Sequence, residues 1–126
     1  MLDKTQRVRL AQPRQDSNIS LERCIGQRRS VRSFRDQALT KDELGQLLWA
    51  AQGVTGPDGG RTVPSAGALY PNRGRGYVYL EAGHAAESVM LQAIALGLAT
   101  TMVGAFSDDG AGRLLCLSSN EIPLCF

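Results

Sequence analysis

The most informative stretch of this sequence is residues 28–34, which read Arg-Arg-Ser-Val-Arg-Ser-Phe. Guanidinium groups bind phosphate through paired, charge-assisted hydrogen bonds. A serine hydroxyl and backbone N–H groups at a helix edge can complete such an anion site. The alternative is a solvated basic face, which is the usual role of a run of charges. Candidate phosphate ligands in this stretch are Arg28, Arg29, Ser30 and Arg32.

The basic stretch belongs to a wider asymmetry of charge. The first 35 residues contain nine Lys or Arg and three Asp or Glu, a net charge of +6, so the remainder carries −4 of the overall +2. A positive cluster of this kind indicates an anionic partner: a phosphate, a nucleic acid or the protein's own acidic half. A nucleic-acid site would interleave aromatic residues for base stacking. Only Phe34 lies among the arginines, so no nucleic-acid partner is predicted.

Capping signals predict short helices on both sides of the basic stretch. Ser20 is a plausible N-cap for a helix over residues 21–27. Thr40 and Glu43 form a Thr-x-x-Glu capping box, and the amphipathic helix that follows is expected to stop at Gly53.

The second half of the chain reads as one long helix, one strand and a last short helix. Residues 83–98 predict a helix that is apolar nearly all round and needs cover from a core or a second subunit. Residues 77–80 suit either a short strand or the entry to that helix. The β-branched segment 100–103 predicts a buried strand, and Ser107 or Asp108 caps a helix that ends near residue 115. A single strand leaves its hydrogen-bonding ladder unpaired, so the chain must be mostly helical or borrow a partner strand.

Two further segments have the composition of ligand sites. Residues 64–71, Pro-Ser-Ala-Gly-Ala-Leu-Tyr-Pro, combine small residues that let a backbone approach a flat ring with the hydroxyl of Ser65. The alternative is an ordinary loop between prolines. Gly104 and Ala105 follow the predicted strand, where ligands often bind in α/β folds; the alternative is a turn into the last helix.

Several classes of site are disfavoured. His84 is the single histidine, and the three cysteines are scattered, so no metal site is predicted and the thiols are expected to be free. Ser65 has no recognisable base for a hydrolytic triad. Glu81 and His84 suit capping of a helix start, or a hydrogen-bonded pair there. No apolar run approaches the ~18 residues of a membrane span, and the polar N-terminus shows no secretory signal. We therefore expect a cytoplasmic protein with a basic arm (1–18) and one domain (19–126).

Taken in order, these segments resemble the nitroreductase family of FMN-dependent oxidoreductases, closest to its SagB-type dehydrogenase branch. The likeness rests on the opening motif 28–34, the helix 44–53, the loop 64–71, which matches that branch nearly word for word, the helix 81–98 and the segment 104–106. The resemblance implies an α+β, nitroreductase-like fold. In this chain the fold is shortened and mostly helical with a depleted central sheet, because residues 72–74 lead from the loop directly to the long helix, and because the chain stops before the family's last strand.

The resemblance also implies a cofactor, a partner and roles for the candidate residues. FMN would bind in a homodimer, at sites built from both subunits. Its phosphate and ribityl chain would be held by Arg28, Arg29, Ser30 and Arg32. The loop of the opposite subunit, with Pro64, Ser65, Ala66 and Gly67, would line the isoalloxazine ring, and the backbone of Gly104 and Ala105 would face it near N5. No catalytic side chain is implied.

The function implied by the resemblance is hydride transfer between the flavin and a small nitro, quinone or azoline substrate, with a nicotinamide donor or another reductant. The alternative is a non-catalytic, flavin-free remnant that dimerises through its apolar helix.

Overall fold

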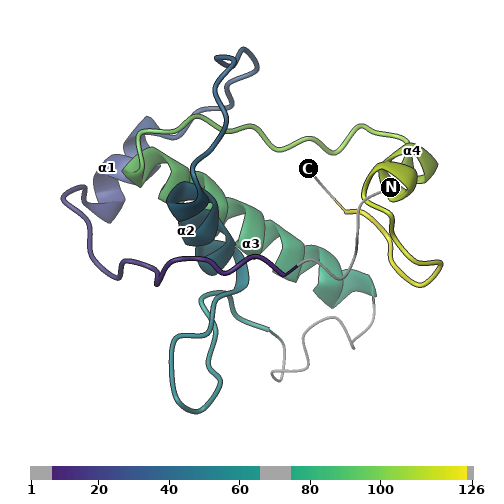
Figure 1. Ribbon diagram of the computed structural model, residues 1–126, viewed down its shortest axis with the longest axis horizontal. Helices are drawn as coiled ribbons and strands as arrows, with labels where there is room; N and C mark the ends of the chain where they lie inside the picture. Colours follow the sequence, from purple (N-terminus) through teal and green to yellow (C-terminus); the bar gives the residue numbers. More distant parts are fainter. Residues whose placement is uncertain (1–6, 66–74, 125–126) are drawn as a thin grey trace. The chain divides into compact units, whose positions relative to one another are not determined.

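The computed structural model describes residues 7–65 and 75–124, and four helices supply nearly all regular structure in that part of the chain (Figure 1). They are α1 (Leu21–Gln27), α2 (Lys41–Gln52), α3 (Arg75–Ala95) and α4 (Asp108–Leu114). Strand pairing among the described residues consists of two isolated bridges, Ser30 with Thr100 and Val54 with Arg61. The expectation of a mostly helical chain with a depleted sheet is confirmed.

Side-chain caps start three of these helices where the sequence predicts them. Ser20 Oγ accepts from the N–H of Arg23 at 3.2 Å, and Ser107 caps α4 in the same way. At α2 the Thr40 hydroxyl accepts from the N–H of Glu43 at 3.2 Å, while the Glu43 carboxylate accepts from the N–H of Thr40 at 2.7 Å. These bonds satisfy N–H groups that a helix start leaves open. Local chemistry therefore sets these boundaries.

Helix α3 is longer at its N-terminal end than predicted. It begins at Arg75, so residues 77–80 are its first turns and the strand alternative for them is wrong. Glu81 and His84 consequently lie inside the helix, and the expectation that they sit at a helix start is also wrong.

Helix α3 ends through a left-handed glycine. Gly97 has a φ of 72°, and the N–H of Leu98 donates to the carbonyl of Ala93 at 2.8 Å. This is the bonding of a Schellman stop, which glycine makes without steric cost. The chain therefore leaves α3 at a defined angle and runs on toward Thr100.

The described residues fall into two compact units. Residues 10–101 form the first, and residues 7–9 with 102–124 form the second. In the first unit α1 and α2 both pack on α3, and Figure 1 shows α2 lying across it. The buried hydrophobic side chains of this unit are small: Cys24, Ala50, Val63 and Ala93.

The segment before α1 is fastened to α2 by one buried amide. Gln46, 6% exposed, accepts from the N–H of Arg14 at 2.8 Å and donates to the carbonyl of Arg14 at 2.9 Å. It also donates to Gln92 Oε1 on α3 at 3.2 Å. A side-chain amide that bonds both backbone groups of one residue acts as a neighbouring strand would. Arg14 thus lies against α2.

The predicted strand 100–103 is not a buried strand. Thr100 forms a bridge with Ser30, but Met102 and Val103 are 49% and 41% exposed. A β-branched segment becomes a strand only when neighbouring strands satisfy its N–H and C=O groups. The described part of the chain supplies one such contact, so the intrinsic preference of these residues is not realised.

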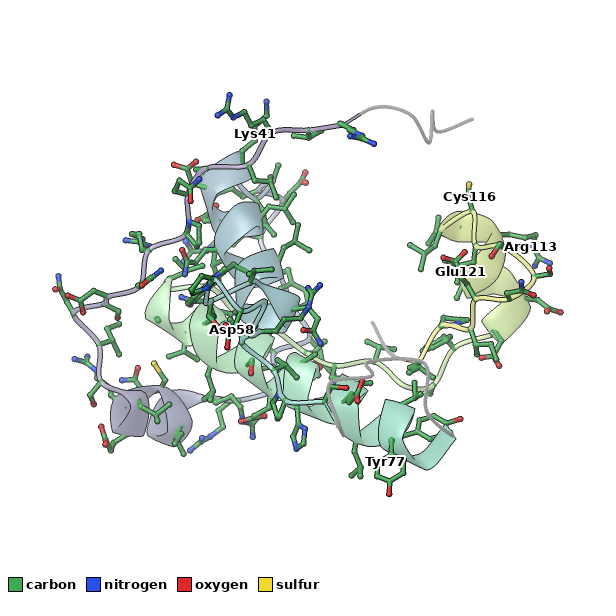
Figure 2. All side chains as sticks on the ribbon, turned by 90° about the horizontal axis from the view of Figure 1, so that it is seen from below. Lys41, Asp58, Tyr77, Arg113, Cys116 and Glu121 are labelled. Carbon is green, nitrogen blue, oxygen red and sulfur yellow. The ribbon has the colours of Figure 1, made fainter. Side chains whose placement is uncertain are left out.

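The second unit is built around α4. Its C-terminal end turns at Cys116, which has a φ of 53°, and the N–H of Leu117 donates to the carbonyl of Gly112 at 2.9 Å. Glu121 Oε2 accepts from the N–H of Ser118 at 2.7 Å in the turn that follows. Figure 2 shows Arg113, Cys116 and Glu121 gathered around this helix and its turn.

Candidate functional site

Two of the candidate arginines stand at the C-terminal end of α1. The N–H of Arg28 donates to the carbonyl of Cys24 at 2.9 Å and closes the helix. The Arg29 guanidinium donates to the carbonyls of Gly26 at 3.1 Å and of Arg28 at 2.6 Å. These carbonyls are among the acceptors that a helix end leaves open. In this structure the Arg29 guanidinium therefore serves its own backbone.

The side chains of Arg28 and Arg32 are less engaged by the fold than that of Arg29. Arg28 Nε lies 3.9 Å from Glu87 Oε1 of α3, and both side chains are partly exposed, so the pair is weak. Arg32 is exposed and makes no hydrogen bond or ion pair with any residue that the structure describes. Of the three arginines in residues 28–32, Arg32 thus has no partner among the described residues, and Arg28 has one weak ion pair.

The backbone of this stretch is fixed from the far end of α3. Ser30 bridges Thr100 in parallel, and the N–H of Val31 donates to the carbonyl of Thr100 at 2.9 Å. The arginine stretch therefore lies between the end of α1 and the segment that leaves α3. A serine hydroxyl at an exposed position remains on the same stretch as the arginines, as an anion site requires.

The loop after α2 folds back on the end of that helix. Arg61 donates to the carbonyl of Gln52 at 2.8 Å, and the Thr62 hydroxyl donates to the carbonyl of Trp49 at 2.9 Å. The N–H of Thr62 donates to the carbonyl of Gly53 at 2.9 Å. Open carbonyls of α2 are thus occupied by the return arm of its own loop, which holds residues 53–62 in one place.

Gly53 is required at the start of this loop. The Trp49 ring lies over it, and a Cβ on residue 53 would come within 2.2 Å of Trp49 Cδ1. Trp49 Nε1 is itself buried without a hydrogen-bond partner among the described residues. The indole thus packs closely against the start of the loop.

The loop after α2 leads to the second group of candidate residues, which begins at Pro64. Val63 is 1% exposed and anchors the chain, Pro64 is exposed, and Ser65 is half-buried. Ser65 Oγ donates to Glu81 Oε1 of α3 at 2.5 Å, a short bond of the kind that a carboxylate acceptor gives. Ser65 is therefore held from both sides, by the loop and by α3. Ala66 and Gly67 lie outside the described residues.

Gly104 and Ala105 belong to the second unit. Both are exposed, and a Cβ added to Gly104 would meet no heavy atom within 4 Å. Their predicted role, facing a ring through the backbone, stays a prediction.

The donor set of residues 28–32 fits a phosphate group. It offers the guanidinium of Arg32, a loosely paired guanidinium of Arg28 and the hydroxyl of Ser30 on a backbone that Thr100 fixes. The described part of the loop offers the held hydroxyl of Ser65 next to the exposed ring of Pro64. An anionic cofactor with a flat ring would suit these two kinds of surface, one charged and one with an apolar ring and a hydroxyl.

A separate open cavity of about 510 Å³ lies in the first unit. Residues before α1 and residues of all three helices line it, including Gln46, Trp49, Leu91 and Gln92. None of the predicted cofactor residues contributes to this lining. The cavity therefore differs from the site predicted from the sequence.

Two glutamates of α3 were not singled out as site residues from the sequence, Glu81 beside Ser65 and Glu87 beside Arg28. Both contacts join segments far apart along the chain, and no spacing pattern announces them. Within residues 7–65 and 75–124, no three His, Cys, Asp or Glu side chains gather as metal ligands do. No helix in the same ranges combines the length and apolar character needed to cross a bilayer.

Comparison with known proteins places these features in context. The model of the nitroreductase family matches the chain in two segments, residues 25–74 and 68–126. A protein of Methanocaldococcus jannaschii that is named as a nitroreductase, MJ1384, is 30% identical over an alignment that is 176 positions long with its gaps, and that covers 84% of this chain and 88% of that protein.

A solved structure gives the same indication for the fold. A crystal structure from Ralstonia eutropha JMP134, named as a nitroreductase, superimposes with a TM-score of 0.83 over 98% of this chain and 89% of that chain. The two sequences are 20% identical, so this likeness concerns the fold alone. The chain shares the fold of that protein.

Proposed function

The chain belongs to the nitroreductase family of oxidoreductases, and on that premise we propose that it is an FMN-dependent oxidoreductase of the SagB-type branch, cytoplasmic and homodimeric. Members of the family generally bind a flavin and act on small molecules as dimers. The proposal gives the chain a small nitro, quinone or azoline substrate and a nicotinamide or other electron donor. FMN, when bound, supplies the hydride-transfer chemistry, and the protein supplies binding and orientation.

The observation that carries the proposal is the arginine stretch. Arg32 points to no partner in the described part of the chain, and Arg28 has one weak partner, Glu87 at 3.9 Å. An exposed guanidinium that the fold does not use is available to a phosphate, and each charge-assisted bond contributes roughly 1.5–3 kcal/mol. In this proposal Arg28, Ser30 and Arg32 hold the phosphate and ribityl chain. Arg29 contributes mainly by closing α1.

The loop 53–65 supports the other half of the cofactor site. Its bonds to the end of α2 and the bond from Ser65 to Glu81 hold it in one conformation before any ligand arrives. A pre-formed surface binds a flat ring without a further cost for ordering the loop. We assign this surface to the isoalloxazine ring, with Pro64 and Ser65 in contact with it, and we keep Ala66, Gly67, Gly104 and Ala105 as predicted neighbours.

A second copy is expected because large apolar side chains stay uncovered. Leu44 and Leu48 on α2, and Tyr77 and Leu80 on α3, are each 42–62% exposed. Figure 2 shows Tyr77 projecting from the first turn of α3. Large apolar side chains left exposed are often covered at protein interfaces. Dimerisation through α2 and α3 would cover it.

The absorbance spectrum of the purified protein tests the proposal. We expect a yellow protein that releases one FMN per chain on denaturation, and that elutes as a dimer in sizing chromatography. A colourless protein that takes up no added FMN would contradict the cofactor assignment.

One observation favours a second candidate, a flavin-free dimerising remnant. The alignment with the Methanocaldococcus protein extends over 176 positions with its gaps, whereas 84% of this chain is about 106 residues, so about 70 positions of that protein have no counterpart here. The family model also matches in two pieces that meet at residues 68–74. Both observations support a deletion of sheet segments after residue 71. A dimer that never binds FMN would favour this candidate.

A further inference from the structure

The hydrogen bond between Ser65 and Glu81 determines how the Ser65 hydroxyl can bond to a ligand. A serine hydroxyl has one proton to donate, and here that proton goes to Glu81 Oε1 at 2.5 Å. Ser65 Oγ can then meet any further group only as an acceptor. Glu81 stands inside α3, so the helix holds the backbone that carries this acceptor.

The loop side of this contact is equally constrained. Val63, two residues before Ser65, is 1% exposed, and Thr62 is bonded to the carbonyls of Trp49 and Gly53. The backbone just before Ser65 is therefore held in place, next to α3. The contact links the end of the α2 loop to the early turns of α3, 16 residues along the chain.

Resting on the proposed function, we propose that Glu81 is a positioning residue of the flavin site. It orients the Ser65 hydroxyl as a hydrogen-bond acceptor toward an N–H group of the isoalloxazine edge, and it places a carboxylate charge one hydrogen bond away from the ring. Glu81 itself does not touch the cofactor. The negative charge behind Ser65 makes the acceptor stronger and makes electron uptake by the ring less favourable.

A double-mutant cycle tests this role in the full-length dimer. Ser65→Ala and Glu81→Ala are each expected to lower FMN affinity by about tenfold, the effect of one hydrogen bond of ordinary strength. The double variant is expected to bind no more weakly than either single variant, because both changes remove the same contact. Additive losses would show that Glu81 does not act through Ser65 and would overturn the proposal.

The midpoint potential of bound FMN separates positioning from a merely structural effect. Glu81→Gln keeps the shape of the side chain and removes its charge, so the potential is expected to rise while the thermal midpoint of unfolding changes little. In the Ser65→Ala background the same substitution is expected to move the potential less. An unchanged potential in Glu81→Gln, in a wild-type protein that binds FMN, overturns this inference alone. A wild-type protein that binds no FMN overturns the proposed function and this role together.

Discussion

The two segments assigned to the cofactor are supported in opposite ways. In residues 53–65, side chains and backbone groups bond to the end of α2 or to α3, through Arg61, Thr62 and Ser65. In residues 28–32, the fold uses the backbone and the Arg29 side chain, Arg28 has one weak contact with Glu87, and Arg32 has no partner among the described residues. In our proposal the first segment contacts the neutral flat ring and the second binds the phosphate. The hydrogen-bonding groups of the first are satisfied within the protein, whereas the second leaves donors open. Substitutions in residues 28–32 should therefore change mainly the affinity for the cofactor, and substitutions in residues 53–65 mainly the free energy of unfolding.

The largest expected effect comes from substitutions in residues 28–32. Arg28→Ala combined with Arg32→Ala removes two charge-assisted donors, so FMN binding should weaken by roughly 3–6 kcal/mol, while the free energy of unfolding changes little. Isothermal titration measures the first quantity and thermal melting the second.

The matched control for charge is Arg23→Ala combined with Arg35→Ala. Both residues are exposed and lie in the same basic third of the chain, outside residues 28–32. Equal losses of affinity in the two double variants would mean that net charge, rather than this stretch, attracts the cofactor.

The next largest effect comes from a substitution in residues 53–65. Gly53→Ala places a Cβ 2.2 Å from Trp49 Cδ1, so the indole or the loop must shift, and stability should fall by about 1–3 kcal/mol. Urea unfolding followed by Trp49, the single tryptophan, measures it. The control Gly26→Ala meets no heavy atom within 4 Å and lies inside α1, so it should stabilise by about 0.5–1 kcal/mol. A neutral Gly53→Ala would show that the loop is not packed as described.

A smaller effect is expected from weakening α2, the helix that precedes residues 53–65. Thr40→Ala removes the N-cap hydroxyl of α2, which should cost about 1 kcal/mol of stability. FMN affinity should stay the same, because Thr40 lies at the end of α2 opposite the loop. Thr40→Ser keeps the hydroxyl and should behave like the wild type; a Ser variant as weak as Ala would assign the loss to the methyl group.

The smallest effect concerns pH. The backbone N–H of Thr40, and then its hydroxyl, lower the pKa of the Glu43 carboxyl from its usual 4.5. A lowered pKa in the folded state adds stability above pH 4.5, and that stability is lost as the pH falls through the lowered value. Glu43→Gln should therefore melt below the wild type at pH 7, and the gap should close in acid. A gap that persists at low pH would mean that the carboxylate charge contributes nothing.

Much of the helical framework follows from single residues. Ser20, Thr40 and Ser107 each satisfy a helix start within three residues, and Gly53 and Gly97 each end one, so these boundaries need no knowledge of tertiary structure. The arginine stretch was likewise visible, because its chemistry is carried by side chains adjacent in sequence.

Contacts between distant segments could not be predicted in the same way. Whether Thr100–Val103 becomes a strand depends on neighbours, and the described chain offers Ser30 alone. The use of Arg29 on its own helix end, and the contacts of Glu81 and Glu87, depend on how the loop and α1 approach α3. Side chains that meet across 16 or more residues leave no periodic trace in the sequence.

The relative affinity for FMN and riboflavin tests the central claim most directly, since the two flavins differ only by the phosphate. If residues 28–32 bind that phosphate with two charge-assisted contacts, a fluorescence titration should give FMN an affinity at least about a hundredfold higher than riboflavin. Equal affinities for the two flavins would contradict the account, because the arginine stretch would then have no part in holding the cofactor.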